Sequence, residues 1–175
     1  YRRQRQMCIR DSPTTDRVKE NVFNLIQDHV RDADVLDLFA GTGAISFELL
    51  SRECAKVVCV EMHPIQYGFI KKVMELLGDR NLVPIKGDVF RFIASCRESF
   101  DFIFADPPYN LPELETIPQK VLDSDLLKPG GLFVLEHSKN NDFSSHPFFF
   151  QHRTYGSVNF TFFLRPEENA EEAGE

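Results

Sequence analysis

Short apolar runs alternate with segments of helical periodicity through most of this sequence, and this alternation limits the folds that the chain can adopt. Repeated alternation is typical of βαβ units, in which parallel strands form one sheet that helices cover on both faces. The sequence therefore predicts an α/β fold. The expected strands are residues 35–39, 56–61, 81–88, 101–106 and 130–137, and the expected helices are 13–30, 44–52, 64–77, 89–97 and a stretch over 111–127 that Pro118 interrupts.

The last part of the sequence departs from this alternation. Residues 147–165 hold two aromatic runs on either side of Tyr155-Gly156-Ser157, which predicts a β-hairpin. The hairpin adds an antiparallel strand to an otherwise parallel sheet. All of these elements belong to one predicted domain, residues 13–166, which has no internal repeat.

The two ends of the chain are interpreted separately from this domain. Residues 1–12 show no clear period and are expected to be irregular, either non-native or disordered. Residues 167–175 read EENAEEAGE and predict a solvated, disordered acidic tail.

Composition argues against several classes of protein. No apolar run approaches the roughly 20 residues that span a bilayer, and the net charge of −7 argues against a large nonspecific nucleic-acid surface. None of the 4 cysteines forms a CxxC pair, and no metal-ligand spacing appears among the cysteines and histidines, so no metal site is expected. These features favour a soluble, cytoplasmic protein with reduced thiols, and we expect a monomer.

Residues capable of chemistry follow the first three predicted strands, at the sheet edge where ligands bind in open parallel sheets. The stretch Asp37-Leu38-Phe39-Ala40-Gly41-Thr42-Gly43 lets backbone approach a ligand closely and precedes a helix N-terminus, although a ligand-free turn remains an alternative. Glu61 follows Gly41 by about 20 residues and could accept both hydroxyls of a ribose, or be an exposed acid. Asp88 could accept from an adenine amine, or cap a helix.

The fourth strand end carries Asp106-Pro107-Pro108-Tyr109. A rigid turn explains the prolines but not the acid and the aromatic ring. Prolines fix the backbone and carry no N–H, so Asp106 and the Pro107 carbonyl can together accept both hydrogens of an amino group. Tyr109 offers a face for stacking a base. This pattern is suited to an amine attached to an aromatic ring.

Together, the stretch from Asp37 to Gly43, Glu61, Asp88 and the Asp106–Tyr109 tetrapeptide resemble the S-adenosylmethionine-dependent amino-methyltransferases, which share a [DN]-P-P-[YFW] sequence. The segment PTTDRVKENVFNLI, just before VLDLFAGTGAISFELLSR, is similar to the bacterial 16S rRNA guanine-N2 methyltransferase family. The resemblance covers roughly residues 13–165. It implies a Rossmann-like class I methyltransferase fold, a seven-stranded and mostly parallel sheet with helices on both faces and the C-terminal antiparallel hairpin.

The resemblance also implies roles for individual residues and a partner. The expected substrate is a guanine N2 amine in 16S rRNA within a small-subunit particle, and the expected cofactor is S-adenosylmethionine. The implied cofactor-binding residues are Asp37, Phe39, Gly41 and Gly43 around the methionine part, Glu61 at the ribose, Asp88 and the Val89 backbone at the adenine, Thr15 and Arg17 at the carboxylate end, and Asp106; the implied catalytic residues are Asp106, Pro107 and Tyr109.

Other functions remain open at this stage. An adenine or cytosine amino-methyltransferase acting on DNA or other RNA uses the same tetrapeptide. An NAD-dependent oxidoreductase could use the Gly41–Gly43 turn and Glu61, but Ser46 takes the third glycine place of the dinucleotide pattern. A non-catalytic RNA-binding module predicts a basic face, against which the net charge of −7 speaks.

Overall fold

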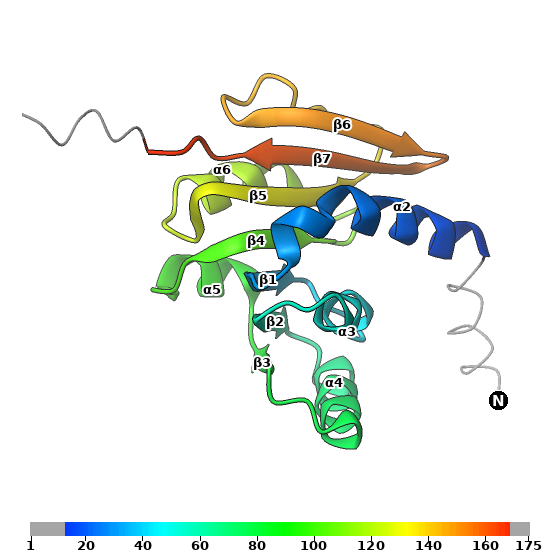
Figure 1. The fold of residues 1–175 in the computed structure, drawn as a ribbon. Helices are drawn as coiled ribbons and strands as arrows, with labels where there is room; N and C mark the ends of the chain where they lie inside the picture. The colour runs from blue at the N-terminus through cyan, green and yellow to red at the C-terminus, as the bar shows by residue number, and fades with distance from the viewer. Residues whose placement is uncertain (1–12, 169–175) are drawn as a thin grey trace, which may run out of the picture.

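A computed structural model describes residues 13–168, so the predictions for residues 1–12 and 169–175 lie outside the described residues. One sheet of 7 strands, in the order β3-β2-β1-β4-β5-β7-β6, organises the described chain (Figure 1). The strands are β1 Asp34–Leu38, β2 Lys56–Glu61, β3 Leu82–Lys86, β4 Phe100–Ala105, β5 Leu127–His137, β6 Phe149–Tyr155 and β7 Val158–Leu164. The helices are α2 Pro13–Val30, α3 Ala44–Ser51, α4 Pro64–Leu77, α5 Val89–Ser95 and α6 Ile117–Leu122, with the 3-10 helix η1 Leu114–Thr116 before α6.

The predicted sheet is confirmed. Strands β3, β2, β1, β4 and β5 pair in parallel, and β7 pairs antiparallel with both β5 and β6. The predicted hairpin joins β6 and β7 through Gly156 and Ser157, where Gly156 has a φ of 62°. Since Gly takes up this left-handed conformation without a Cβ clash, the turn can be this short.

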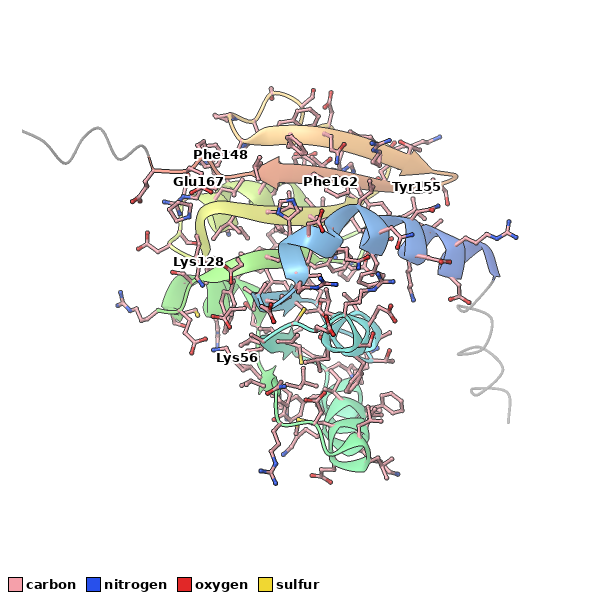
Figure 2. The ribbon with its side chains drawn as sticks, in the orientation of Figure 1. Lys56, Lys128, Phe148, Tyr155, Phe162 and Glu167 are labelled. Atoms are coloured by element: carbon pink, nitrogen blue, oxygen red, sulfur yellow. The ribbon has the colours of Figure 1, made fainter. Side chains whose placement is uncertain are left out.

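Two apolar cores lie on the opposite faces of the sheet. Because successive strand residues point to opposite faces, Phe102 belongs to one core and its neighbour Ile103 to the other. Helices α2, α3 and α4 cover the first core, and α5 and α6 cover the second, so helices lie on both faces as predicted (Figure 1). Phe162 of β7, labelled in Figure 2, extends the first core toward the hairpin. None of the helices within residues 13–168 has the length and hydrophobicity needed to cross a bilayer.

Local sequence signals set the bounds of α4 and explain the position of β3. Helix α4 has Pro64 in its first turn, His63 Nδ1 accepts from the Ile65 N–H at 3.3 Å, and the helix ends at Gly78 with a φ of 63°. Strand β3 contains Pro84, which has no N–H to donate to a ladder. The strand lies at the edge of the sheet and pairs only with β2, where such a residue is tolerated.

Two segments differ from the sequence-based expectation. Pro118 does not interrupt a long helix but lies in the first turn of α6, after the separate helix η1. Strand β5 begins at Leu127 rather than at residue 130, because the Pro-Gly-Gly segment is part of the strand. The pairing of this segment with β4 shifts register between Phe100 and Phe102. A Cβ on Gly131 would lie 2.8 Å from the Lys128 carbonyl oxygen, so the irregular segment needs a glycine at this position.

We expect Phe102→Ala to lower the free energy of unfolding by about 3–5 kcal/mol, because the ring is fully buried and its removal leaves a cavity. Equilibrium urea denaturation measures this loss. Phe150→Ala is the matched control, since that ring is 55% exposed on the edge strand β6 and its loss should change stability by less than about 1 kcal/mol. An equal loss in the two variants would contradict the core position of Phe102.

Candidate active site

The loop between β1 and α3 is anchored by a buried acid. Asp37 of β1 is 1% exposed, and the Ser46 hydroxyl of α3 donates to its Oδ2 at 2.6 Å. Above this bond the chain passes through left-handed conformations at Phe39 (φ 59°), Gly41 (φ 59°) and Gly43 (φ 82°). Such a conformation is uncommon for a phenylalanine, and local backbone strain of this kind is frequent at functional sites.

The two glycines of this loop serve different purposes. A Cβ on Gly43 would lie 3.0 Å from Ile70 and 3.1 Å from Phe47, so this glycine is needed for packing. A Cβ on Gly41 would meet nothing within 4 Å. Gly41 therefore faces open space, and its left-handed backbone leaves that space free for a ligand.

Glu61, the last residue of β2, lies against the same loop. Its Oε2 accepts from the Gly41 N–H at 2.7 Å and its Oε1 accepts from the His63 N–H at 3.0 Å. Each carboxylate oxygen has two lone pairs, so each retains one acceptor site after these bonds. The half-buried Glu61 can therefore accept hydrogen bonds from a ligand while it holds the glycine loop in place.

Asp88 has the capping role that the sequence left open. Its Oδ1 accepts from the Arg91 N–H at 3.0 Å at the start of α5, and Val89 follows as a buried residue. The second oxygen of Asp88 makes no hydrogen bond within the described residues, so the cap does not exclude a ligand role. Phe39 and Phe90 meet edge to face at 6.4 Å, which links the glycine loop to α5.

The Asp106–Tyr109 tetrapeptide begins directly after β4. The Asp106 N–H donates to the Leu38 carbonyl of β1 at 3.4 Å, which keeps this segment beside the glycine loop. Pro107 is buried and Asp106 is exposed. Tyr109 is 44% exposed, and its hydroxyl donates to Glu136 Oε1 at 2.9 Å. The ring is therefore held by its hydroxyl while part of its surface stays accessible.

Glu136, near the end of β5, is a residue of this site that the sequence analysis missed. Ala105 of β4 pairs with Leu135 of β5, so Asp106 and Glu136 both come one residue after the same pair. Their carboxyl groups lie close enough to share a hydrogen bond. The acid before His137 in the expected strand was the available signal, but its relation to Tyr109 depends on the pairing of β4 with β5.

The environment of Asp106 raises the pKa of its carboxyl well above the usual value. Burial of the carboxyl by surrounding protein atoms raises this pKa most, followed by the hydrogen bond to Glu136 and the charges of Glu136 and Asp37. The charge of Lys19 in α2 lowers it. Asp106 is nonetheless exposed to solvent, and the neighbouring Glu136 carboxylate opposes its ionisation. The Asp106 carboxyl therefore holds its proton to a higher pH than an isolated aspartate does.

The first turns of α2 carry Thr15 and Arg17, the residues predicted at the carboxylate end of the cofactor. Arg17 is exposed and makes no hydrogen bond or ion pair within the described residues. The side chain of Thr15 lies outside the described residues. Lys19, one helical turn further along α2, is the cation whose charge acts on Asp106. The structure thus brings Asp37, Gly41, Glu61 and Asp106 to one edge of the sheet.

Acids at the two ends of the parallel strands have different partners. At the amino ends, Lys128 Nζ lies 3.2 Å from Asp101 and 3.7 Å from Asp34, and Lys56 pairs with Glu98 at 3.1 Å (Figure 2). At the carboxyl ends, no ion pair with a described cation involves the acids Asp37, Glu61, Asp106 and Glu136. This edge is suited to a ligand that brings positive charge or N–H and O–H donors.

Two surface hollows lie away from this edge. One of about 330 Å³ lies near the amino ends of the strands, between Asp28, Asp101 and Glu167, and another of about 260 Å³ lies between α6 and the segment around His146. Neither brings acids together with an open glycine loop, so we assign the candidate site from the converging residues rather than from the hollows. No group of at least 3 potential metal-ligating side chains was found within residues 13–168.

Solved structures with the same architecture are similar to this chain over most of its length. A protein of Escherichia coli described as a methyltransferase gives a TM-score of 0.79 with 26% identity, and covers 90% of this chain and 89% of its own. A T. thermophilus 16S rRNA N2 methyltransferase in complex with AdoMet and guanosine gives a TM-score of 0.71 with 22% identity over 88% of this chain and 43% of its own, which shows the shared fold. The fold is the Rossmann-like fold that this chain shares with solved S-adenosylmethionine-dependent methyltransferases, and the methyltransferases of about 31% identity described next show that the chain belongs to this class.

Sequence comparison identifies the family. The family model described as Conserved hypothetical protein 95 matches residues 2–164, and the chain belongs to this family. Ribosomal RNA small subunit methyltransferase D of Escherichia coli strain K12 is 31% identical over 149 residues, which are 83% of this chain and 75% of that protein. The protein of the same name from Haemophilus influenzae is 31% identical over 73% of this chain and 68% of its own length. The chain spans 64% of the relative of that name from Buchnera aphidicola subsp. Baizongia pistaciae.

The buried acid of the glycine loop makes stability depend on pH. Burial raises the pKa of Asp37 from 3.8 to about 7, the hydrogen bond from Ser46 opposes this rise, and the charge of Glu61 adds to it. The folded protein therefore holds the proton more tightly than the unfolded chain does. This contribution to stability is fully present below pH 3.8 and is lost as the pH rises to about 7, by about 4 kcal/mol at about 1.4 kcal/mol per pKa unit.

We expect Asp37→Asn to remove this dependence, because an amide accepts from Ser46 without ionising. The difference in melting temperature, variant minus parent, should rise between about pH 4 and pH 7 and stay constant above. Thermal unfolding followed by circular dichroism at each pH measures it. Asp125→Asn, at an exposed acid before β5, is the control and should give the same small difference throughout. A pH-independent difference for Asp37→Asn would refute the prediction.

Proposed function

We propose that this protein transfers a methyl group from S-adenosylmethionine to the exocyclic N2 amine of a guanine in 16S rRNA. The position of Asp106 and Tyr109 supports the proposal most directly, because both follow β4, the strand beside β1 and its glycine loop. The relatives named as ribosomal RNA small subunit methyltransferases support the choice of substrate. A small-subunit particle as the substrate and a monomeric enzyme are parts of the same proposal.

The residues at this edge fit the proposed cofactor. Gly41 faces open space, and each oxygen of Glu61 retains an acceptor site that suits a ribose hydroxyl. Asp37 and Gly43 shape the loop for the methionine part of the cofactor. S-adenosylmethionine supplies an electrophilic methyl group on a positively charged sulfur when it is bound.

Further contacts to the cofactor are proposed from the same arrangement. The free oxygen of Asp88 and the Val89 backbone would take the adenine amine and ring nitrogen, and Phe39 would flank the loop. Thr15 and Arg17 would act at the carboxylate end. Arg17 is exposed in the first turns of α2, so its side chain is accessible to a ligand.

The proposed chemistry depends on how the tetrapeptide holds the amine. Asp106 and the Pro107 carbonyl accept its two hydrogens, which draws the nitrogen toward tetrahedral geometry and frees its lone pair. Tyr109 supports the base by stacking. A bound S-adenosylmethionine would give its methyl group to this lone pair and leave as S-adenosylhomocysteine, and Asp106 or water would take the proton that the nitrogen then loses. Because the hydrogen bonds strengthen as positive charge develops on the nitrogen, the arrangement stabilises the transition state more than the bound substrate.

The observations disfavour the oxidoreductase that the sequence left open. Ser46, at the third glycine place of a dinucleotide pattern, is buried and bonded to Asp37, so its hydroxyl has a structural use that glycine lacks. Membership in the methyltransferase class does not by itself decide whether the methylated amino group belongs to guanine, adenine or cytosine.

We expect the parent protein to incorporate labelled methyl groups at one guanine N2 of unmodified small-subunit particles. Asp106→Ala should reduce this rate by about 100-fold or more, because an acceptor of the reacting amine is lost, while it still binds S-adenosylhomocysteine. Asp125→Ala, at an exposed acid on another part of the surface, is the control and should keep the parent rate. Equal labelling by Asp106→Ala and the parent would remove Asp106 from its proposed role.

We expect Gly41→Ala to weaken S-adenosylhomocysteine binding by about tenfold or more, because its methyl group enters the open space beside Glu61. Isothermal titration calorimetry measures the affinity. Gly156→Ala is the matched control: its φ of 62° is close to the 59° of Gly41, and its added Cβ also meets nothing within 4 Å. Both variants should lose similar stability, of about 1 kcal/mol, but only Gly41→Ala should lose affinity. Unchanged affinity in Gly41→Ala would exclude a cofactor at this loop.

A further inference from the structure

Two carboxylates stand side by side at the ends of neighbouring strands. Ala105 and Leu135 form the last register pair of β4 and β5, and Asp106 and Glu136 follow them. Glu136 is half-buried, and no ion pair connects it to a cation among the described residues. The role proposed for Asp106 at the reacting amine does not use the second carboxylate.

The free acceptor of Glu136 can be identified from its bond to Tyr109. The Tyr109 hydroxyl donates to Oε1 at 2.9 Å, which leaves Oε2 as an acceptor without that donor. Because Tyr109 is 44% exposed and its ring is proposed to stack on the base, a base on that ring has its edge near the carboxylates. Glu136 therefore fixes the ring and presents an oxygen beside Asp106.

The edges of the bases differ at the position next to the amine. Guanine has the N2 amine next to N1–H, so that two neighbouring groups donate. Adenine has its N6 amine next to N1, and cytosine has its N4 amine next to N3, and both ring nitrogens are acceptors. A pair of carboxylates therefore matches guanine, whereas with adenine or cytosine one carboxylate would face a lone pair and remain without a partner.

We propose that Glu136 is a specificity-determining residue that accepts the N1–H of the target guanine while Asp106 accepts from its N2 amine. This inference rests on the proposed function and deepens it, because it names the group that separates guanine from the other amino-bearing bases. It also gives the pair of acids a use that the reaction itself does not require.

The surrounding charges are compatible with this use. Asp37 of β1 and the carboxylate pair itself repel added negative charge, whereas Lys19 of α2 attracts it. The Tyr109 hydroxyl remains protonated, because burial and the neighbouring Glu136 raise its pKa. A guanine edge would supply two N–H donors to this pair, of which Glu136 already accepts from the Tyr109 hydroxyl.

The test compares guanosine 5′-monophosphate with 2-aminopurine riboside 5′-monophosphate, which keeps the amine of guanine but has an acceptor at N1. The full chain is loaded with S-adenosylhomocysteine, and both affinities are measured by NMR titration. The parent should prefer the guanine nucleotide by about 10- to 100-fold. In Glu136→Gln the amide oxygen still accepts from Tyr109, so the amide NH2 faces the ring nitrogen. That variant should lose or reverse the preference.

Tyr109→Phe is the matched control, because it removes the bond to Glu136 and keeps both carboxylates and the ring. It should weaken both nucleotides and keep the preference for guanine. Melting temperatures of both variants close to that of the parent establish that they fold. A parent that binds the two nucleotides equally, or binds neither, overturns the inference, and so does a Glu136→Gln variant with the parent's preference.

Methyl incorporation into small-subunit particles separates this inference from the proposed function. If the parent labels a guanine N2 and Glu136→Gln keeps the nucleotide preference, the proposed function stands and the inference fails. If the preference is lost in Glu136→Gln but the parent labels no particle, the base-edge assignment stands and the rRNA reaction fails.

Discussion

The hydrogen bond between Ser46 and the buried carboxyl of Asp37 is the interaction on which the candidate site depends. It fixes the start of α3 against the end of β1, so the intervening loop must return through left-handed conformations. That path brings the Gly41 N–H to Glu61 on β2. A single buried acid thus couples two strand ends, and its raised pKa is the energetic consequence of burying a charge-capable group beneath the loop.

Local signals made part of this structure predictable. Helix α4 has the predicted bounds, because Pro64 and Gly78 act through neighbouring residues only. The start of β5 was wrong because the Pro-Gly-Gly segment belongs to an irregular pairing with β4, which no local pattern reveals. Strand-end placement brought Asp37, Gly41, Glu61 and Asp106 together. Glu136 escaped prediction because its contact with Tyr109 spans 27 residues.

An acidic site is compatible with the proposed RNA substrate, although RNA carries negatively charged phosphates. Phosphate contacts position a protein on nucleic acid, whereas contacts to base edges give specificity. Carboxylates at the ends of β4 and β5 repel phosphate but accept from base N–H groups. The net charge of −7 therefore bears on contacts to the phosphates, whereas the proposed role of Asp106 concerns the edge of the base. Ion pairs at the amino ends of the strands neutralise acids there, and the described carboxyl edge keeps its acids for a ligand.

The proline in β3 has a consequence for how the sheet meets other molecules. An outermost strand presents a row of backbone donors and acceptors that a strand from another chain can extend. Asn81 and Gly87 bond to β2, so by alternation the Pro84 nitrogen faces the open edge of β3 and leaves that row without one donor. The missing donor makes this flank a poor template for intermolecular strand addition and disfavours aggregation through the open edge of the sheet.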